Sequence, residues 1–182
     1  MAMTHDSSQL QGSASEEQWA HFHRRETEHA GPTSHHKVLS QDEGTWDSTV
    51  QIFAGPPGAR PLSFQGFETY KVMNGGLWTM AEIHGDHQIV GVYGYDTNRN
   101  KYVGTWVEST NPFRVLMEGD YDEPSRTLTM IANGVDPVTK MPVREKQVIT
   151  HKDDDTRMLS LYRLEEDGRE TRILEATAKR RK

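Results

Sequence analysis

The feature that most constrains the fold is a repeated pattern of short alternating runs along the chain from residue 45 onward. In the first run, 45–53, the side chains of Trp46, Val50 and Ile52 fall on one face, and polar side chains take the other. Such alternation is typical of a half-buried strand. Turn-forming residues interrupt the pattern about every 10–12 residues, which is the spacing of an all-β sandwich or barrel. Asn74-Gly75-Gly76 is a strong hairpin signal among them.

The pattern predicts about ten strands, near 45–53, 62–73, 77–84, 88–95, 101–109, 113–121, 126–133, 143–150, 157–164 and 170–178. The connections are too short for a crossover helix, so neighbouring strands should pair antiparallel. An open meander would leave two reactive edges, and closure removes them. We therefore expect an all-β fold: one closed antiparallel meander barrel.

The chain ahead of this pattern has a different composition. Residues 1–32 are rich in Ser, Gln, Glu and His and carry few large apolar side chains. Such a composition predicts a disordered tail, with a short helix near 16–28 as its one element. A second short helix, capped by Thr33 or Ser34, should lead into the first strand. The predicted organisation is thus a His-rich tail over 1–32 and a barrel domain over 33–182.

Several function classes are disfavoured by composition and by missing motifs. The net charge of −6 argues against nucleic-acid binding, and the absence of cysteine removes disulfides and thiolate chemistry. No apolar run approaches the roughly 20 residues of a membrane span, and no secretory signal is present, so we expect a cytoplasmic protein without a membrane partner. There is no phosphate-binding loop, dinucleotide fingerprint, nucleophile elbow or zinc-protease motif. The sequence does not decide the oligomeric state, and a homodimer is one possibility.

Two tryptophan motifs carry a resemblance. Gly44-Thr45-Trp46-Asp47 opens the first strand directly after a short helix, and Gly104-Thr105-Trp106 lies in the fifth. The first resembles the calycin superfamily, in which this tryptophan packs under the closed end of the barrel and a basic residue from near the chain end lies across it. The resemblance gives that role to Lys179, Arg180 or Arg181.

A longer set of motifs over residues 36–182 is similar to the bacterial domain-of-unknown-function family numbered 1579. The order and spacing of the motifs carry the resemblance, and Gly94–Trp106 is their most specific part. The sequence departs from the family pattern at Asn74, where the family more often has Gly, and at Glu108, where it more often has Asp. The resemblance implies a calycin-type barrel and no activity. The motifs are His36-Lys37-x-Leu39, Gly44-Thr45-Trp46, Gly66-x-Glu68, Asn74-Gly75-Gly76, Gly94-Tyr95-Asp96, Lys101–Trp106, Gly119-x-Tyr121-Asp122 and the basic end.

Three carboxylates, Glu68, Glu82 and Glu108, fall on strand faces that otherwise look apolar. A carboxylate in a dry barrel would have a raised pKa and could act as a general acid or base. The alternative is that these side chains face solvent, or form structural ion pairs with Arg114, Arg144, Lys146 or Arg172.

An aromatic and methionine set is the material of a ligand cavity, and equally of a barrel core. Its members are Tyr70, Trp78, Met80, Tyr93, Tyr95, Trp106, Met117 and Tyr162. The leading hypothesis is an intracellular protein that binds a small, mostly apolar molecule in the lumen. The alternative is a cofactor-independent isomerase, cyclase or dehydratase that uses Glu68, Glu82 or Glu108. No cofactor and no metal are expected: His84, His87 and His151 lie at strand ends, and no haem motif accompanies them.

Overall fold

The computed structural model describes residues 14–27, 31–56, 58–136 and 139–182, and these fall into two units divided at Gly31–Pro32. The first unit contains helix α1 (Glu16–Thr27), on which the rings of Trp19 and Phe22 meet edge to face. This helix matches the one expected near 16–28. Half of residues 1–32 lie outside the described part, and the predicted disorder of this segment stays a prediction.

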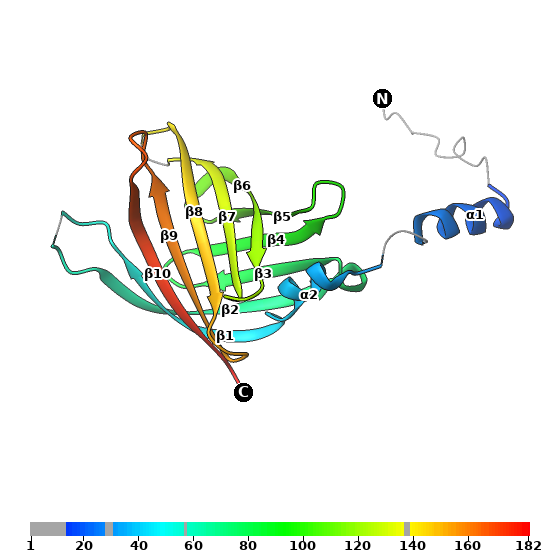
Figure 1. The fold of residues 1–182 in the computed structure, drawn as a ribbon, viewed down its shortest axis with the longest axis horizontal. Coiled ribbons are helices and arrows are strands. Elements are labelled where there is room, and N and C mark those ends of the chain that lie inside the picture. Colours follow the sequence, from blue (N-terminus) through cyan, green and yellow to red (C-terminus); the bar gives the residue numbers. More distant parts are fainter. Residues whose placement is uncertain (1–13, 28–30, 57, 137–138) are drawn as a thin grey trace, which may run out of the picture. The chain divides into compact units, whose positions relative to one another are not determined.

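The second unit is a closed barrel of ten antiparallel strands, preceded by one short helix (Figure 1). Each strand pairs with its neighbours in sequence, and β1 also pairs with β10, so the sheet has no free edge. The expected fold class is therefore confirmed. The elements are α2 (Ser34–Ser40), β1 (Gly44–Ile52), β2 (Leu62–Met73), η2 (Asn74–Gly76), β3 (Trp78–His84), β4 (Gln88–Asp96), β5 (Lys101–Glu108), β6 (Asn111–Asp122), β7 (Thr127–Val135), β8 (Pro142–His151), β9 (Thr156–Leu164) and β10 (Glu170–Arg180).

The turn between β2 and β3 shows why the sequence signal was reliable. Asn74, Gly75 and Gly76 all have positive φ, at 51°, 67° and 99°. Glycine adopts this region without a steric penalty, and asparagine tolerates it better than most residues. The Asn-Gly-Gly run therefore fixes the hairpin and, with it, the register of β2 against β3.

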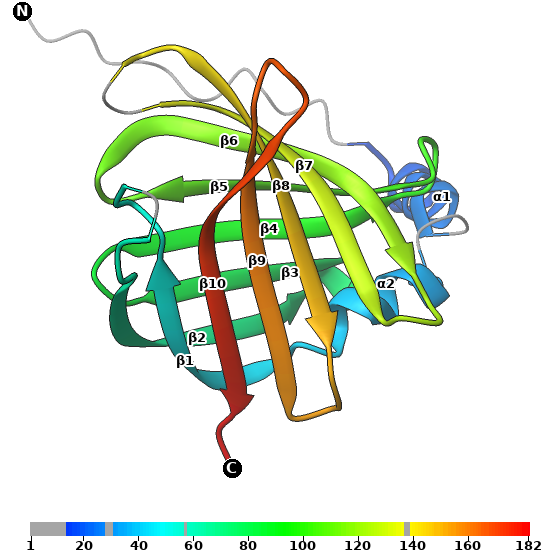
Figure 2. The ribbon, with the colours of Figure 1, turned by 60° about the vertical axis from the view of Figure 1, so that its left-hand side comes forward.

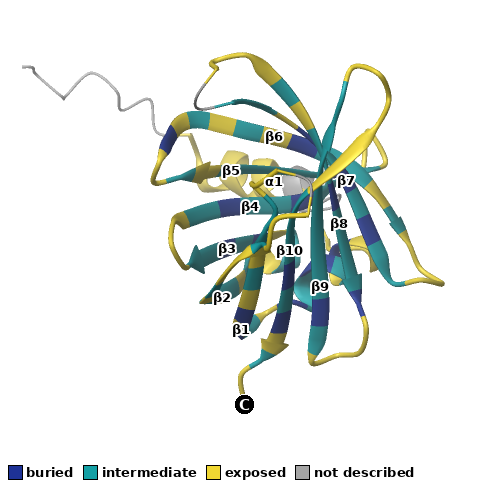
Figure 3. Ribbon diagram, turned by 90° about the vertical axis from the view of Figure 1, so that its left-hand side faces the viewer, coloured by how far each residue is buried: buried dark blue, intermediate teal, exposed yellow. Residues whose placement is uncertain are grey.

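Helix α2 and the chain after it lie at one end of the barrel, which we call the base (Figure 2). Thr33 is the helix N-cap, and its backbone N–H donates to His36 Nδ1 at 3.0 Å. Leu39 packs into a core cluster that lies on β5, β6 and β7. The loops are exposed, and buried bands lie on β1, β9 and β10 among others (Figure 3). Many of the buried side chains therefore lie toward the base, among them Trp46, Ser48 and Arg157.

Trp46 is the centre of the base and is fully buried. Its indole Nε1–H donates to the backbone carbonyl of Asp42 at 2.8 Å, and the Arg180 guanidinium lies 4.2 Å from its ring. Register explains the contact, because Trp46 and Arg180 are direct cross-strand partners on β1 and β10. The expectation that a basic residue near the chain end covers Trp46 is confirmed for Arg180.

No helix among the described residues is long and apolar enough to cross a membrane.

Candidate ligand cavity

The barrel encloses a cavity of about 350 Å³, a volume within the range of small-molecule sites. Its walls come from the inward faces of the strands, and its lining extends from Asp42 at the base to Gly85, His87 and Asp136 at the opposite end, which we call the rim. Much of the wall is aliphatic, with Val50, Ile52, Ile83, Ile89, Leu161 and Leu174 among its members. Charged side chains gather at the two ends.

At the base, four charged or polar side chains form a buried network, which we call the base group: Asp42, Glu68, His151 and Arg157. Arg157 Nη1 forms an ion pair with Asp42 Oδ2 at 3.0 Å, and Arg157 Nη2 donates a hydrogen bond to Glu68 Oε2. His151 Nε2 lies 2.8 Å from Asp42 Oδ1. Since an ionised carboxylate only accepts hydrogen bonds, Nε2 is the protonated nitrogen of that contact. One guanidinium therefore links two carboxylates in a dry place.

Aromatic rings complete the surroundings of Arg157. Its guanidinium lies 4.3 Å from the Tyr70 ring and 4.9 Å from the Trp46 ring. Tyr70 also donates its hydroxyl to Glu68 Oε2 at 3.0 Å. Burial raises the pKa of Tyr70 and that of Tyr93, with Arg157 opposing in both cases, so both phenols stay neutral. The pKa of Arg157 is raised, because the nearby Tyr70, Asp42 and Glu68 outweigh the cost of its burial.

At the rim, a second set of charged side chains faces the cavity, which we call the rim group: Glu108, Asp136, Glu145 and Arg163. Arg163 donates to Asp136 Oδ2 and to Glu145 Oε1, each at 3.2 Å. Its side chain is 35% exposed, against 6% for Arg157. Burial raises the pKa of the Glu145 carboxyl; Arg163 opposes this effect, and the charges of Glu108 and Asp136 add to it. The rim group is therefore wetter and less completely balanced than the base group.

Five of the residues predicted for the site line the cavity: Glu68, Tyr70, Tyr93, Trp106 and Glu108. Glu68 and Tyr70 belong to the surroundings of Arg157 at the base, whereas Glu108 ends β5 at the rim. The ion-pair partner of Glu68 is Arg157, which was not among the four basic residues considered as partners. The catalytic and binding roles of these residues stay predictions.

Three predicted residues of β3, Trp78, Met80 and Glu82, do not line the cavity, since Thr79 and Ile83 are the β3 residues that do. Adjacent strand residues point to opposite faces, so Trp78, Met80 and Glu82 lie on the outer face. Trp78 is 36% exposed, and a Cβ added to Gly94 would fall within 2.5 Å of its ring atoms. The aromatic ring thus covers a glycine of the neighbouring strand from outside, a position that alternation alone does not separate from the lumen.

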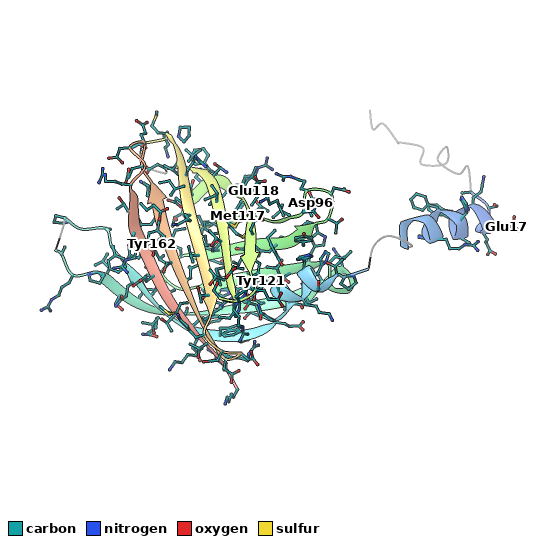
Figure 4. The ribbon with its side chains drawn as sticks, in the orientation of Figure 1. Glu17, Asp96, Met117, Glu118, Tyr121 and Tyr162 are labelled. Atoms are coloured by element: carbon teal, nitrogen blue, oxygen red, sulfur yellow. The ribbon has the colours of Figure 1, made fainter. Side chains whose placement is uncertain are left out.

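The other three predicted residues, Tyr95, Met117 and Tyr162, also lie outside the lining. Met117 is a core residue, and Tyr95 packs against the same cluster and stacks on His35. Tyr162 lies on β9, where Arg157, Leu159 and Leu161 share the inward face, and its ring contacts Lys146 from outside. Met117 and Tyr162 are labelled on β6 and β9 in Figure 4.

No sequence motif pointed to Asp42 or Arg157, and His151 was predicted only as a possible haem ligand. The sequence did contain a signal that could have identified Arg157 as a buried residue. Arg157, Leu159 and Leu161 are spaced two residues apart, so on a strand the arginine lies on the same face as two leucines. Asp42 had none, since it lies in the turn after α2, where no periodicity operates. Among the described residues, no three His, Asp or Glu side chains lie close enough together to hold a metal ion.

Comparison with known proteins places this barrel among solved folds. A crystal structure of Rv2717c from M. tuberculosis superposes with a TM-score of 0.60 at 14% identity, covering 82% of this chain and 99% of that one. The S-type phycobiliprotein lyase CPES from Guillardia theta superposes with a TM-score of 0.52 at 12% identity, covering 84% and 95%. At these identities the likeness concerns the fold.

A search among curated proteins finds no match. The family model described as "Protein of unknown function (DUF1579)" matches residues 31–180, which span the whole barrel and helix α2. The chain therefore belongs to the DUF1579 family.

Proposed function

We propose that this protein binds a small organic molecule with a largely apolar body in the barrel lumen. The observation that carries the proposal is the cavity of about 350 Å³, whose aliphatic walls end in polar groups. Ligand sites are concave and mostly apolar, with a few convergent polar groups that fix orientation. A barrel core with no such role would be expected to fill its interior at ordinary packing density.

The base group supports a rigid end to such a site. Asp42, Glu68 and Arg157 satisfy one another, and Trp46 and Tyr70 enclose the guanidinium between their rings. A network whose members are held by packing and by one another presents a fixed surface to a ligand. The cost of ordering that surface is met in folding, so it does not weaken binding.

The test is titration with the neutral dye N-phenyl-1-naphthylamine, whose fluorescence rises in apolar surroundings. The wild-type protein should bind one dye molecule per chain. Ala176→Phe places a ring in the cavity, because Ala176 is a buried lining residue of β10, and should weaken dye binding by about tenfold or more. Thr177→Phe is the matched control, since Thr177 is the next residue of the strand and points to the outer face.

A second filling variant, Leu159→Trp on β9, covers the case in which Ala176→Phe fails to fold. Each variant is first checked by circular dichroism and thermal melting. A wild-type protein that does not bind the dye, or folded filling variants that bind it as well as Thr177→Phe, would overturn the proposal. Native mass spectrometry of protein from its own host should also reveal a retained small molecule.

A further inference from the structure

The charged residues that line the cavity are strongly unbalanced in sign. The carboxylates exceed the guanidinium groups by five to two. At the base, Arg157 contacts both carboxylates directly. The carboxylates are Asp42, Glu68, Glu108, Asp136 and Glu145, the guanidinium groups are Arg157 and Arg163, and His84, His87 and His151 also line the cavity.

The rim contains one carboxylate, Glu108, that has no ion pair within the described residues. Arg163 is shared between Asp136 and Glu145. Glu108 makes no side-chain hydrogen bond or ion pair within the described part of the chain, and its charge is close enough to raise the pKa of Glu145. Carboxylates held together inside a cavity repel one another, and a cation between them would relieve that repulsion.

An independent observation points to a missing hydrogen-bond donor. Gln147 and His151 lie on the inward face of β8 and line the cavity, with 5% and 6% exposure. The Oε1 atom of Gln147 and the Nδ1 atom of His151 are buried and have no hydrogen-bond partner among the residues that the structure describes. Because His151 Nε2 carries the proton that it donates to Asp42, Nδ1 is an acceptor in the neutral ring. A third buried atom on a lining residue, Arg163 Nε, also has no partner among the described residues, and it is a donor.

Buried acceptors without a donor are costly in a folded protein, and a ligand that supplies the donor recovers that cost. Gln147 lies two residues from Glu145 on the same face of β8, so its orphan acceptor is next to the negative rim. A group that is both positively charged and rich in N–H donors would satisfy both features. An ammonium group has these two properties.

We propose that the lumen takes an organic amine in its ammonium form, with the charged head between Glu108, Glu145 and Gln147 and the apolar body along the aliphatic wall. This inference rests on the proposed function and names the chemical class of its ligand. The apolar wall selects an organic cation over a bare metal ion, and the described residues contain no cluster suited to a metal. A carboxylate head in the same place would face three like charges, those of Glu108, Asp136 and Glu145, against the single guanidinium of Arg163.

The test compares three unbranched eight-carbon probes that differ in their head group: octylammonium, 1-octanol and octanoate. Each displaces N-phenyl-1-naphthylamine from the wild-type protein at neutral pH, and calorimetry checks the affinities. Octylammonium should bind more tightly than 1-octanol by about tenfold, and octanoate should bind most weakly. The preference should shrink as salt is raised, since part of the attraction is between charges.

The variants locate the charged head. Glu108→Gln should lower the octylammonium affinity by about tenfold and leave that of 1-octanol unchanged. Glu82→Gln is the matched control, because it removes the same charge from a carboxylate outside the lining and should have no effect. Gln147→Leu removes the orphan acceptor without changing charge and should weaken octylammonium binding, which gives a second reading if Glu108→Gln is unstable.

The outcomes separate this inference from the proposed function. If 1-octanol and octylammonium displace the dye equally well, or octanoate is preferred, the ammonium class is wrong while lumen binding stands. If Glu82→Gln weakens octylammonium binding as much as Glu108→Gln, the effect is one of overall charge and the placement at the rim is wrong. If none of the probes displaces the dye and the dye itself does not bind, the proposed function fails.

Discussion

The base and the rim of the cavity contain the same kinds of side chain in different states. Each has acidic residues gathered around one arginine. At the base, Arg157 is 6% exposed, contacts two carboxylates and lies near two aromatic rings. At the rim, Arg163 is 35% exposed, and Glu108 next to its partners is left without an ion pair in the described structure.

The difference separates charges that maintain the fold from charges that are available to a ligand. Removing one partner from the dry ion-pair network of Asp42, Glu68 and Arg157 leaves an uncompensated charge, whereas solvent partly compensates such a loss at the rim. Stability should therefore depend more on the base, and ligand selection more on the rim. Substitutions at the two ends test this division, and the largest effect on stability is expected at the base.

Trp46→Ala should cause the largest loss of stability, about 4–5 kcal/mol. The substitution opens a cavity in the centre of the base, and it removes the ring that faces Arg157 and Arg180. Urea denaturation followed by circular dichroism measures the change. Trp106→Ala is the comparison, because Trp106 lines the cavity and is partly exposed, so its loss should cost clearly less. Equal losses would contradict the view that the base is the structural end.

Arg157→Met should destabilise the protein by about 3–4 kcal/mol, since it leaves Asp42 and Glu68 as buried charges without a cation. Arg163→Met, the matched change at the rim, should cost only about 1 kcal/mol, because water reaches that guanidinium. Denaturant unfolding of both variants and of the wild-type protein measures the two losses of unfolding free energy, which can then be compared. A loss in Arg163→Met as large as that in Arg157→Met would break the distinction between the two ends.

The sequence was sufficient for the barrel because its signals are local. Turn residues such as Asn74-Gly75-Gly76 fix hairpins between consecutive strands, and a meander needs no other pairing information except its closure. The Trp46–Arg180 contact followed from a resemblance and was confirmed by the register of β1 against β10. Strand limits differ from the expected ones by no more than two residues at either end.

The site was harder to predict because alternation gives two faces and does not say which one is inside. Two large apolar residues of β3, Trp78 and Met80, lie on its outward face, where Trp78 covers Gly94. Glu82 follows them at period two and was therefore assigned to the lumen. The base group joins side chains from the turn after α2 and from β2, β8 and β9. No spacing along the chain connects Asp42 to Arg157; only barrel closure does so.

The smallest predicted effect is a pH dependence that arises at the rim. Burial, with the charges of Glu108 and Asp136, raises the pKa of Glu145 above its ordinary value of 4.5, against the opposing effect of Arg163. Between 4.5 and the raised pKa, the folded protein holds this proton more often than the unfolded chain does. Stability follows the difference in protons bound, so this contribution is fully present below pH 4.5 and is lost as pH rises through the folded pKa.

The amide in Glu145→Gln cannot ionise, so this variant should not show the loss of stability with rising pH that Glu145 causes in the wild-type protein. Its free energy of unfolding relative to wild type should therefore rise as pH is raised from 4.5, on top of a constant offset from the changed contact with Arg163. Urea denaturation at a series of pH values measures the difference. Glu108→Gln removes one of the charges that raise the pKa of Glu145, so it should make the decline shallower without abolishing it. A difference between Glu145→Gln and wild type that is flat with pH, or that falls as pH rises, would show that Arg163 already balances the rim. In that case the rim would offer a bound cation no unmet charge at Glu145, and the contrast with the base would be reduced to a difference in exposure.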